Sequence, residues 1–297
     1  MPIELELDYW KDKLKDIKPL DLNTDYPKPD ARNTKKGSVD FSVGEEIIKP
    51  LSLVGERNNV SLFVTLLTAY KILLYRYSGQ EDISVGNLTC GACDAKNETD
   101  PGTLILRSEI NGNNQFDELS QRVKALVNEA CEHLKVPFEI VADLLVQDLN
   151  LSMNDLFRAM FVMQNETDGR DKLSKKHTSA ADIILILKEE GAGLQGTVEY
   201  DAELYKEETI LRFAEHYKIL LSSIIAYPEK SIGALPILTK AEEHKLLYEF
   251  NDTLIDYPKE KTLADIFEEQ VVRSPDAVAL RQHEETMTYR ELNERAN

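Results

Sequence analysis

The sequence predicts an α/β fold, because segments of helical periodicity alternate with segments of strand periodicity along most of its 297 residues. Residues 62 to 78 follow Ser61, a residue type that caps helices, and they are apolar nearly all round, which predicts a helix buried on both sides. Residues 194 to 200 alternate with a period of two, which is typical of a strand. The combination predicts a core built from both kinds of element.

The remaining elements of the first half follow in order. Leu7, Trp10 and Leu14 mark one face of a short helix, and the proline-bearing residues 21 to 36 predict a long loop. Further along the chain we expect strands at 39 to 43, 83 to 85 and 104 to 110, and an amphipathic helix at 116 to 130.

The second half predicts strands at 157 to 163 and 183 to 187, and a long helix at 207 to 226 that Pro228 stops. Residues 231 to 238 form an extended segment, and Thr239 with Glu242 has the spacing of a capping box, so a helix follows to about Phe250. We place a domain boundary near residue 235, where the periodic pattern gives way to this connector.

Behind a polar connector at 251 to 261, Thr262 caps another helix, and residues 278 to 281 predict a strand. Thr288 and Glu291 form one more capping box, which opens a helix only a few residues before the last one. So short a helix has little length to propagate, and we expect the chain to be a piece of a longer protein.

Composition excludes several classes of function. A net charge of −18 argues against binding to nucleic acid and to anionic membrane. The longest apolar runs are too short to span a bilayer, and the N-terminus has no signal-peptide pattern. Three cysteines in a chain of this length fit a reducing compartment. We therefore expect a soluble cytoplasmic protein.

The sequence contains no recognisable active-site motif. Cys90 and Cys93 have thioredoxin-like spacing, but a polar, glycine-bearing loop surrounds them instead of a helix start. None of the five histidines lies in a triad-like pattern, and we expect His216 and His244, both within helices, to be solvated or capping. No metal-ligand spacing or glycine-rich phosphate loop occurs, so we expect no bound metal or cofactor.

Several blocks, in order, resemble condensation domains of nonribosomal peptide synthetases. The segment His133-Leu-Lys-Val-Pro137-Phe138-Glu139 is similar to their His-x-x-x-Pro-Phe-Glu block. The segment Ser152-Met-Asn154-Asp-Leu156-Phe157 is similar to their Ser-Arg-Asn-Pro-Leu-Phe block, and Thr103 to Arg107 to the end of their Asn-Thr-x-x-Leu-Arg block. The Tyr-Trp helix at Leu7 to Leu14, the proline loop at 25 to 29 and the turn at 77 to 83 also match.

This resemblance implies three regions. Residues 1–235 would be the C-terminal lobe of a condensation domain with the chloramphenicol-acetyltransferase-like α/β sandwich fold, and 236–261 an inter-domain linker. Residues 262–297 resemble the opening of an adenylation domain and would form an incomplete start of one. The matching motif positions are expected to be mainly structural. The resemblance also implies carrier proteins as partners, which bear the phosphopantetheine cofactor.

The family forms amide bonds with a His-His-x-x-x-Asp-Gly block in the N-terminal lobe, and no adjacent histidine pair occurs among these 297 residues. The Ser-Arg-Asn-Pro-Leu-Phe block is altered as well, with Met153 and Asp155 in place of Arg and Pro. We therefore expect a fragment that is not catalytic alone. Two alternatives stay open: a module that binds a carrier protein or a separate N-terminal lobe in trans, and a stand-alone acyltransferase with His133 as its base.

Overall fold

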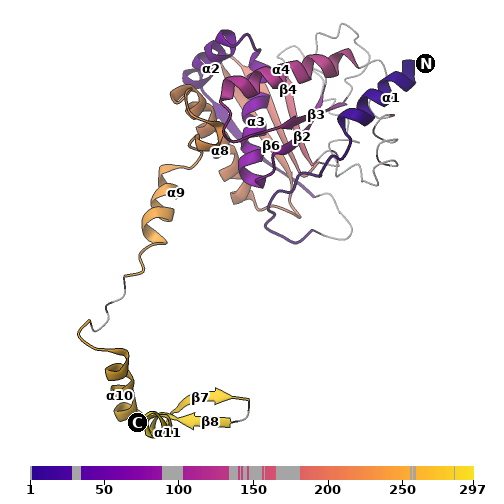
Figure 1. Ribbon diagram of the computed structural model, residues 1–297. Helices are drawn as coiled ribbons and strands as arrows, with labels where there is room; N and C mark the ends of the chain where they lie inside the picture. Colours follow the sequence, from indigo (N-terminus) through magenta and orange to yellow (C-terminus); the bar gives the residue numbers. More distant parts are fainter. Residues whose placement is uncertain are drawn as a thin grey trace. The chain divides into compact units, whose positions relative to one another are not determined.

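The computed structural model of the chain describes residues 2–28, 35–88, 103–133, 158–164, 181–254, 259–283 and 285–297, together with 140, 142, 146, 156 and 256. The chain divides into two compact units, Met1–Glu242 and Glu243–Asn297. The first unit holds the sheet and the long helices, and the second a short hairpin with two helices (Figure 1).

A mixed sheet of six strands forms the centre of the first unit. Its order across the sheet is β1 (Lys36–Val43), β6 (Gly193–Asp201), β5 (Ile183–Glu190), β4 (Ala159–Gln164), β2 (Asp82–Leu88) and β3 (Thr103–Glu109). The pairs β1–β6, β6–β5 and β2–β3 are antiparallel, whereas β5–β4 and β4–β2 are parallel. The β4–β2 pairing is short, since only Gly86 and Asn87 are in register with Met160 and Phe161.

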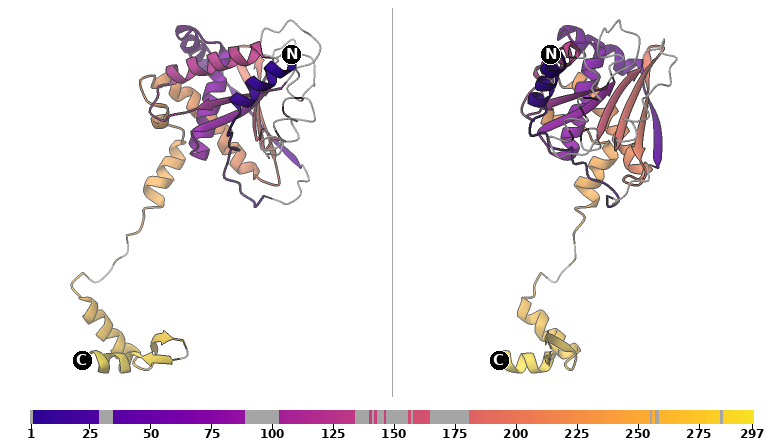
Figure 2. Two further views of the ribbon diagram at one scale, coloured as in Figure 1. Left: turned by 45° about the vertical axis from the view of Figure 1, so that its right-hand side comes forward. Right: turned by 90° about the vertical axis from the view of Figure 1, so that its right-hand side faces the viewer.

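Helices form a layer beside the strands, as the right-hand view of Figure 2 shows. Helices α2 (Glu45–Arg57), α3 (Leu62–Ser78) and α8 (Glu207–Ala226) contact one another, and α4 (Phe116–Glu132) lies against α3 and β3. The predicted burial of α3 is confirmed, because residues Phe63 through Leu74 are all buried. Ser61 caps this helix by accepting a hydrogen bond from the amide of Val64 at 3.3 Å.

The N-terminal helix α1 (Pro2–Lys13) is fixed to the unit through its predicted apolar face. Trp10 and Leu14 are 2% and 0% exposed. The indole Nε1 of Trp10 donates to the carbonyl oxygen of His133, directly after α4, at 3.4 Å. The helix is therefore tied to the C-terminal end of α4.

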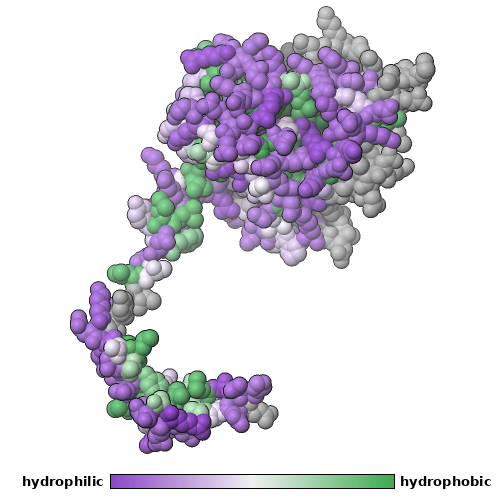
Figure 3. Space-filling view, in the orientation of Figure 1, coloured by the Kyte–Doolittle hydropathy of each residue, from purple (hydrophilic) through white to green (hydrophobic). Residues whose placement is uncertain are grey.

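The connecting segment begins with a short 3₁₀ turn, η1 (Ile232–Ala234), and continues into α9 (Lys240–His244) and the π-helical turn η2 (Lys245–Glu249). Thr239 and Glu242 form the predicted capping box, with three hydrogen bonds of 2.9 to 3.1 Å. Figure 3 shows apolar residues gathered along this segment. The exposed large apolar side chains here are Leu238, Leu246, Leu247, Tyr248, Phe250 and Leu254.

The second unit contains α10 (Leu263–Arg273), β7 (Val278–Gln282), β8 (Glu285–Thr288) and α11 (Tyr289–Ala296). Capping boxes open both α10 and α11, at Thr262 and Thr288 respectively. Among the described residues from 243 to 297 no side chain is fully buried. Leu263 and Val272, on opposite sides of α10, are 87% and 83% exposed, whereas Phe267 and Val271 are half-buried.

Helix α2 is an element that the sequence analysis did not predict. A proline within it, Pro50, and its mixture of charged and apolar residues obscure the helical pattern. In the part of the chain that the structure describes, no single helix is long and apolar enough to cross a membrane. Helices α2 and α3 together have the necessary length and composition, but they meet at a 102° bend and α3 is mostly buried in the unit.

Candidate functional site

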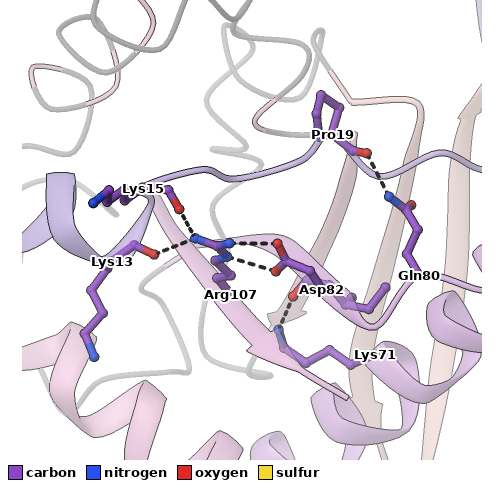
Figure 4. A network of polar contacts seen from close by, with 8 residues as sticks. Lys13, Lys15, Pro19, Lys71, Gln80, Asp82 and Arg107 are labelled. Atoms are coloured by element: carbon purple, nitrogen blue, oxygen red, sulfur yellow. Dashed lines mark hydrogen bonds and ion pairs between the residues drawn. The ribbon is translucent and has the colours of Figure 1, made fainter. Parts of the chain in front are cut away.

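Arg107, a position of the Leu-Arg motif, holds three elements together. From β3 it makes a two-pronged ion pair with Asp82 of β2, with Nε–Oδ1 and Nη2–Oδ2 distances of 2.9 and 2.8 Å (Figure 4). Its Nη1 donates to the carbonyl oxygens of Lys13 and Lys15, at 3.2 and 2.6 Å. These carbonyl groups lie at the C-terminal end of α1. The last carbonyl groups of a helix have no N–H donor within the helix, and a positive charge beside them is favourable. Arg107 therefore joins the end of α1 to the edge of the sheet.

The chain that leaves α1 is held beside this ion pair by a second polar side chain. Gln80 donates to the carbonyl oxygen of Pro19 at 3.2 Å (Figure 4). It also accepts from the amide of Asp21 at 2.6 Å. A surface hollow lies here, lined by three cationic and three acidic side chains: Lys13, Lys18, Arg107, Glu81, Asp82 and Glu109. The balance of charge and the engagement of Arg107 on all sides indicate a structural brace instead of an anion site.

Lys71 lies close to this brace but inside the core. Its ammonium donates to the carbonyl oxygen of Ile83 at 3.3 Å and to that of Leu106, and it is 0% exposed. Burial lowers the pKa of Lys71 to about 7, and the nearby Asp82 opposes that shift. A depressed lysine pKa is common at catalytic sites, but here both hydrogen bonds go to backbone of the sheet.

His133, the candidate base of the acyltransferase hypothesis, lies between α1 and the end of α4. Its Nδ1 is 2.9 Å from Oε2 of Glu6, which is 4% exposed, and its ring stacks on that of Tyr9 with the centroids 3.7 Å apart. Burial, followed by the charge of Glu129, raises the pKa of Tyr9. The imidazole thus serves as a clamp between two helices.

The other motif positions divide into two groups. Thr103 and Leu156 are buried at 0% and 2% exposure, in keeping with a structural role. Six further positions lie outside the described residues: Pro137, Phe138, Glu139, Ser152, Asn154 and Phe157. Cys90, Cys93 and His177 lie outside them as well. Arg107 and His133 both contact α1. In the part of the chain that the structure describes, they do not line a common pocket.

His216 corrects the expectation of a solvated or capping histidine. It is 5% exposed, and both of its ring nitrogens have partners, Tyr77 at 2.7 Å and Glu242 at 2.9 Å. Helical periodicity predicts on which face of a helix a residue lies, but it does not predict which residues pack against that face. The partners of His216 therefore could not be predicted from the sequence. His244 is largely exposed, as expected.

Among the described residues no group of three or more His, Cys, Asp or Glu side chains could hold a metal ion. The described part of the chain also brings no histidine next to a serine or cysteine nucleophile in hydrogen-bond contact, the arrangement that acyl transfer through a covalent intermediate requires. Of the described motif residues, Arg107 is bound to Asp82 and to the backbone at the end of α1, and His133 to Glu6.

Comparison with known proteins agrees with this architecture. Residues 3–247 match the condensation domain family. The chain is 35% identical to gramicidin S synthase 2 of Aneurinibacillus migulanus over 310 residues, and 35% identical to surfactin synthase subunit 1 of Bacillus subtilis over 307 residues. These alignments cover 99% and 97% of the chain but only 7% and 8% of the relatives.

Solved structures show the same fold at lower identity. A four-domain nonribosomal peptide synthetase bound to AMP and glycine superposes with a TM-score of 0.78 at 20% identity, over 98% of this chain and 24% of that one. The X-domain from teicoplanin biosynthesis gives 0.68 at 21% identity, over 80% of this chain and 57% of that one. The fold is thus the acetyltransferase-like α/β architecture of condensation domains, and the chain belongs to the condensation-domain family of nonribosomal peptide synthetases.

Proposed function

We propose that residues 1–235 are the C-terminal lobe of a condensation domain, which takes part in peptide-bond formation between aminoacyl and peptidyl thioesters held on carrier proteins. Residues 236–261 are the linker, and 262–297 the start of an adenylation domain. The observation that carries the proposal is the family match over residues 3–247 together with the ordered motif blocks within it. The partners are carrier proteins that bear phosphopantetheine.

On this proposal the 297 residues do not catalyse condensation by themselves. A general base must lie within hydrogen-bond reach of the amine that it serves, and the adjacent histidine pair on which the family depends is not in this sequence. His133 is engaged by Glu6 and Tyr9, which supports a structural role for it.

The test is a condensation assay with carrier-loaded donor and acceptor, run on the chain alone and with a separate N-terminal lobe that carries the histidine block. We expect no product above background from the chain alone. Product that appears only when the lobe is added would identify a partner that completes the domain in trans. Product from the chain alone that disappears in His133→Ala would support the acyltransferase alternative and overturn the proposal.

The adenylation assignment has its own test. Three large apolar side chains of α10, those of Leu263, Ile266 and Val272, are exposed, and their exposure supports the assignment to a segment of a larger domain. A phosphate-binding loop does not occur in this sequence, so we expect no amino-acid-dependent exchange between ATP and pyrophosphate. Exchange in a clean preparation would contradict the assignment.

A further inference from the structure

The connecting segment after α8 is fastened to the first unit by its backbone. Arg76 of α3 donates to the carbonyl oxygen of Leu235 at 2.8 Å, and the hydroxyl of Ser223 on α8 donates to that of Pro236 at 2.8 Å. Leu235 itself is 2% exposed. The chain is therefore held along this stretch, although its sequence is that of a linker.

The start of the same stretch is held even more closely. The amide of Gly233 donates to the carbonyl oxygen of Gly112 at 2.9 Å, and that of Ile232 to Asn114 at 2.9 Å. A Cβ atom on Gly233 would stand 3.0 Å from the Gly112 carbonyl oxygen, so the two backbones approach as closely as glycine allows.

The last tie is a relay of three side chains from three helices. Tyr77, near the end of α3, has its hydroxyl 2.7 Å from Nδ1 of His216 on α8. Nε2 of His216 is 2.9 Å from Oε2 of Glu242, in the first turn of α9. Because a carboxylate only accepts, Nε2–H donates to Glu242, and in the neutral ring Nδ1 accepts from Tyr77. Every polar atom of the buried imidazole is thereby satisfied.

Electrostatics favours the ionised form of the carboxylate in this relay. Burial raises the pKa of Glu242, but hydrogen bonds from His216 and from Thr239 outweigh it and lower the pKa below its ordinary value. Burial also raises the pKa of Tyr77, which Arg212 partly opposes, so the tyrosine keeps its proton. Both partners are held in the state that the relay requires.

Beyond Glu242 the side chains become exposed to solvent. All residues from 243 to 254 are exposed, and the side-chain hydrogen bonds of Asn251 go to Leu246 and Leu247 within the same stretch. The relay, by contrast, holds the connecting segment through a side chain that packs against α8.

We propose that Tyr77, His216 and Glu242 form a latch that holds the first turn of α9 on the first unit and thereby sets how much of the connecting segment is free to move. Closed, the latch fixes α9, which continues directly into η2, by its first turn. Open, it leaves the Arg76 tie at Leu235 and the Ser223 tie at Pro236 in place and frees residues 237–242 as additional chain.

The test uses the two lysines on either side of Glu242, Lys240 and Lys245. In the full chain, trypsin cleavage after Lys240 requires the latch to open, whereas cleavage after Lys245 does not. When cleavage is slow compared with closing, its rate reports the population of the open state. A hydrogen bond to a charged group contributes about 1.5 to 3 kcal/mol, so His216→Phe is expected to raise cleavage after Lys240 relative to Lys245 at least about tenfold. Mass spectrometry of the first fragments gives both rates.

The matched control is His244→Phe, the same change at an exposed histidine in α9, which is expected to leave the ratio unchanged. Tyr77→Phe keeps the ring packed on Phe213 and removes only the hydroxyl, so a smaller rise is expected. An unchanged ratio in His216→Phe overturns the proposal. A rise in cleavage after Lys240 that is matched by equal increases after Arg122 and Lys218 also overturns it, because that pattern means unfolding of the whole unit. A Tyr77→Phe variant in which cleavage after Lys240 does not rise overturns it as well.

Discussion

Lys71 is a charged residue type in the interior of a buried helix, and its position makes stability depend on pH. The folded chain holds this lysine with a pKa of about 7, against an ordinary value of 10.5. Below pH 7 the lysine is protonated in both the folded and the unfolded state. Between pH 7 and 10.5 only the unfolded state keeps the proton, so the free energy of unfolding rises with pH by up to about 1.4 kcal/mol per pH unit.

We predict that Lys71→Met removes this rise. Urea unfolding of the parent and the variant at intervals from about pH 7 to 9.5 measures it, and Lys18→Met, a change at an exposed lysine, is the control. The range stops there because burial also raises the pKa of Tyr70, whose ionisation would add an opposite slope at higher pH. Parallel curves for the parent and Lys71→Met would show that Lys71 titrates normally.

A second prediction concerns the planar geometry of Arg107. Arg107→Lys keeps the charge but loses the two-pronged contact with Asp82 and at least one of the bonds that end α1. Because the two side chains are 25% and 28% exposed, solvent screens part of the loss, and we expect a decrease of about 1 to 2 kcal/mol in the free energy of unfolding. Arg122→Lys, at an exposed position, is expected to change it by less than about 0.5 kcal/mol.

These residues also show how far a sequence leads at the scale of single side chains. Arg107 and His133 could be found from motif blocks, but their pairing with Asp82 and Glu6 could not, because nothing local marks a contact across the fold. Tyr77 and His216 are 139 residues apart in the chain. Such contacts follow from the arrangement of whole helices, which periodicity does not determine.

Elements were predicted with more success, and α3 shows why. Its apolar run and its N-terminal cap are local signals, and the helix ends at Gly79, which has a φ of 69° and donates its amide to Tyr75. By contrast, α2 was missed because Pro50 interrupts its pattern, although the chain tolerates that residue in the middle of the helix. Local signals therefore decide the elements unless a residue breaks the pattern.

We predict that Gly79→Ala lowers the free energy of unfolding by about 1 kcal/mol, because a Cβ atom disfavours the left-handed conformation that ends the helix. Nothing lies within 4 Å of a Cβ atom at this position, so the loss would come from the backbone alone and not from a clash. Gly79→Asn, which tolerates this conformation better, is expected to lose less. Chemical denaturation of the three proteins measures the order, and an alanine variant as stable as the parent would contradict it.

At the scale of the whole molecule, the division into units differs in position from the boundary expected near residue 235. The first unit extends to Glu242, because Arg76, Ser223 and His216 hold the intervening segment. The sequence signals the change to a linker-like composition, and it does not signal that these residues are bound. The assignment of residues 262–297 to an adenylation domain remains a prediction.

We predict that a chain ending at Glu242 melts at the temperature of the first unit in the full chain, whereas one ending at Leu235 melts lower. The shorter chain loses the carboxylate partner of His216 and the carbonyl partner of Ser223, and leaves two buried donors without these acceptors. Differential scanning calorimetry of the two chains and the full protein makes the comparison. Equal melting temperatures for the two truncated chains would contradict the prediction.

The pairing of β1 with β6 also determines when the sheet can be completed during synthesis. Lys36 lies opposite Asp201, so the two strands are separated by 201 − 36 = 165 residues. At a translation rate of roughly 5 to 20 residues per second, β1 waits roughly 8 to 33 s for β6, its neighbour in the sheet. For that time the nascent chain carries an unpaired strand edge, which is open to association with other chains. Slower translation lengthens this exposure, so a chaperone that binds emerging strands protects β1 most where the ribosome moves slowly.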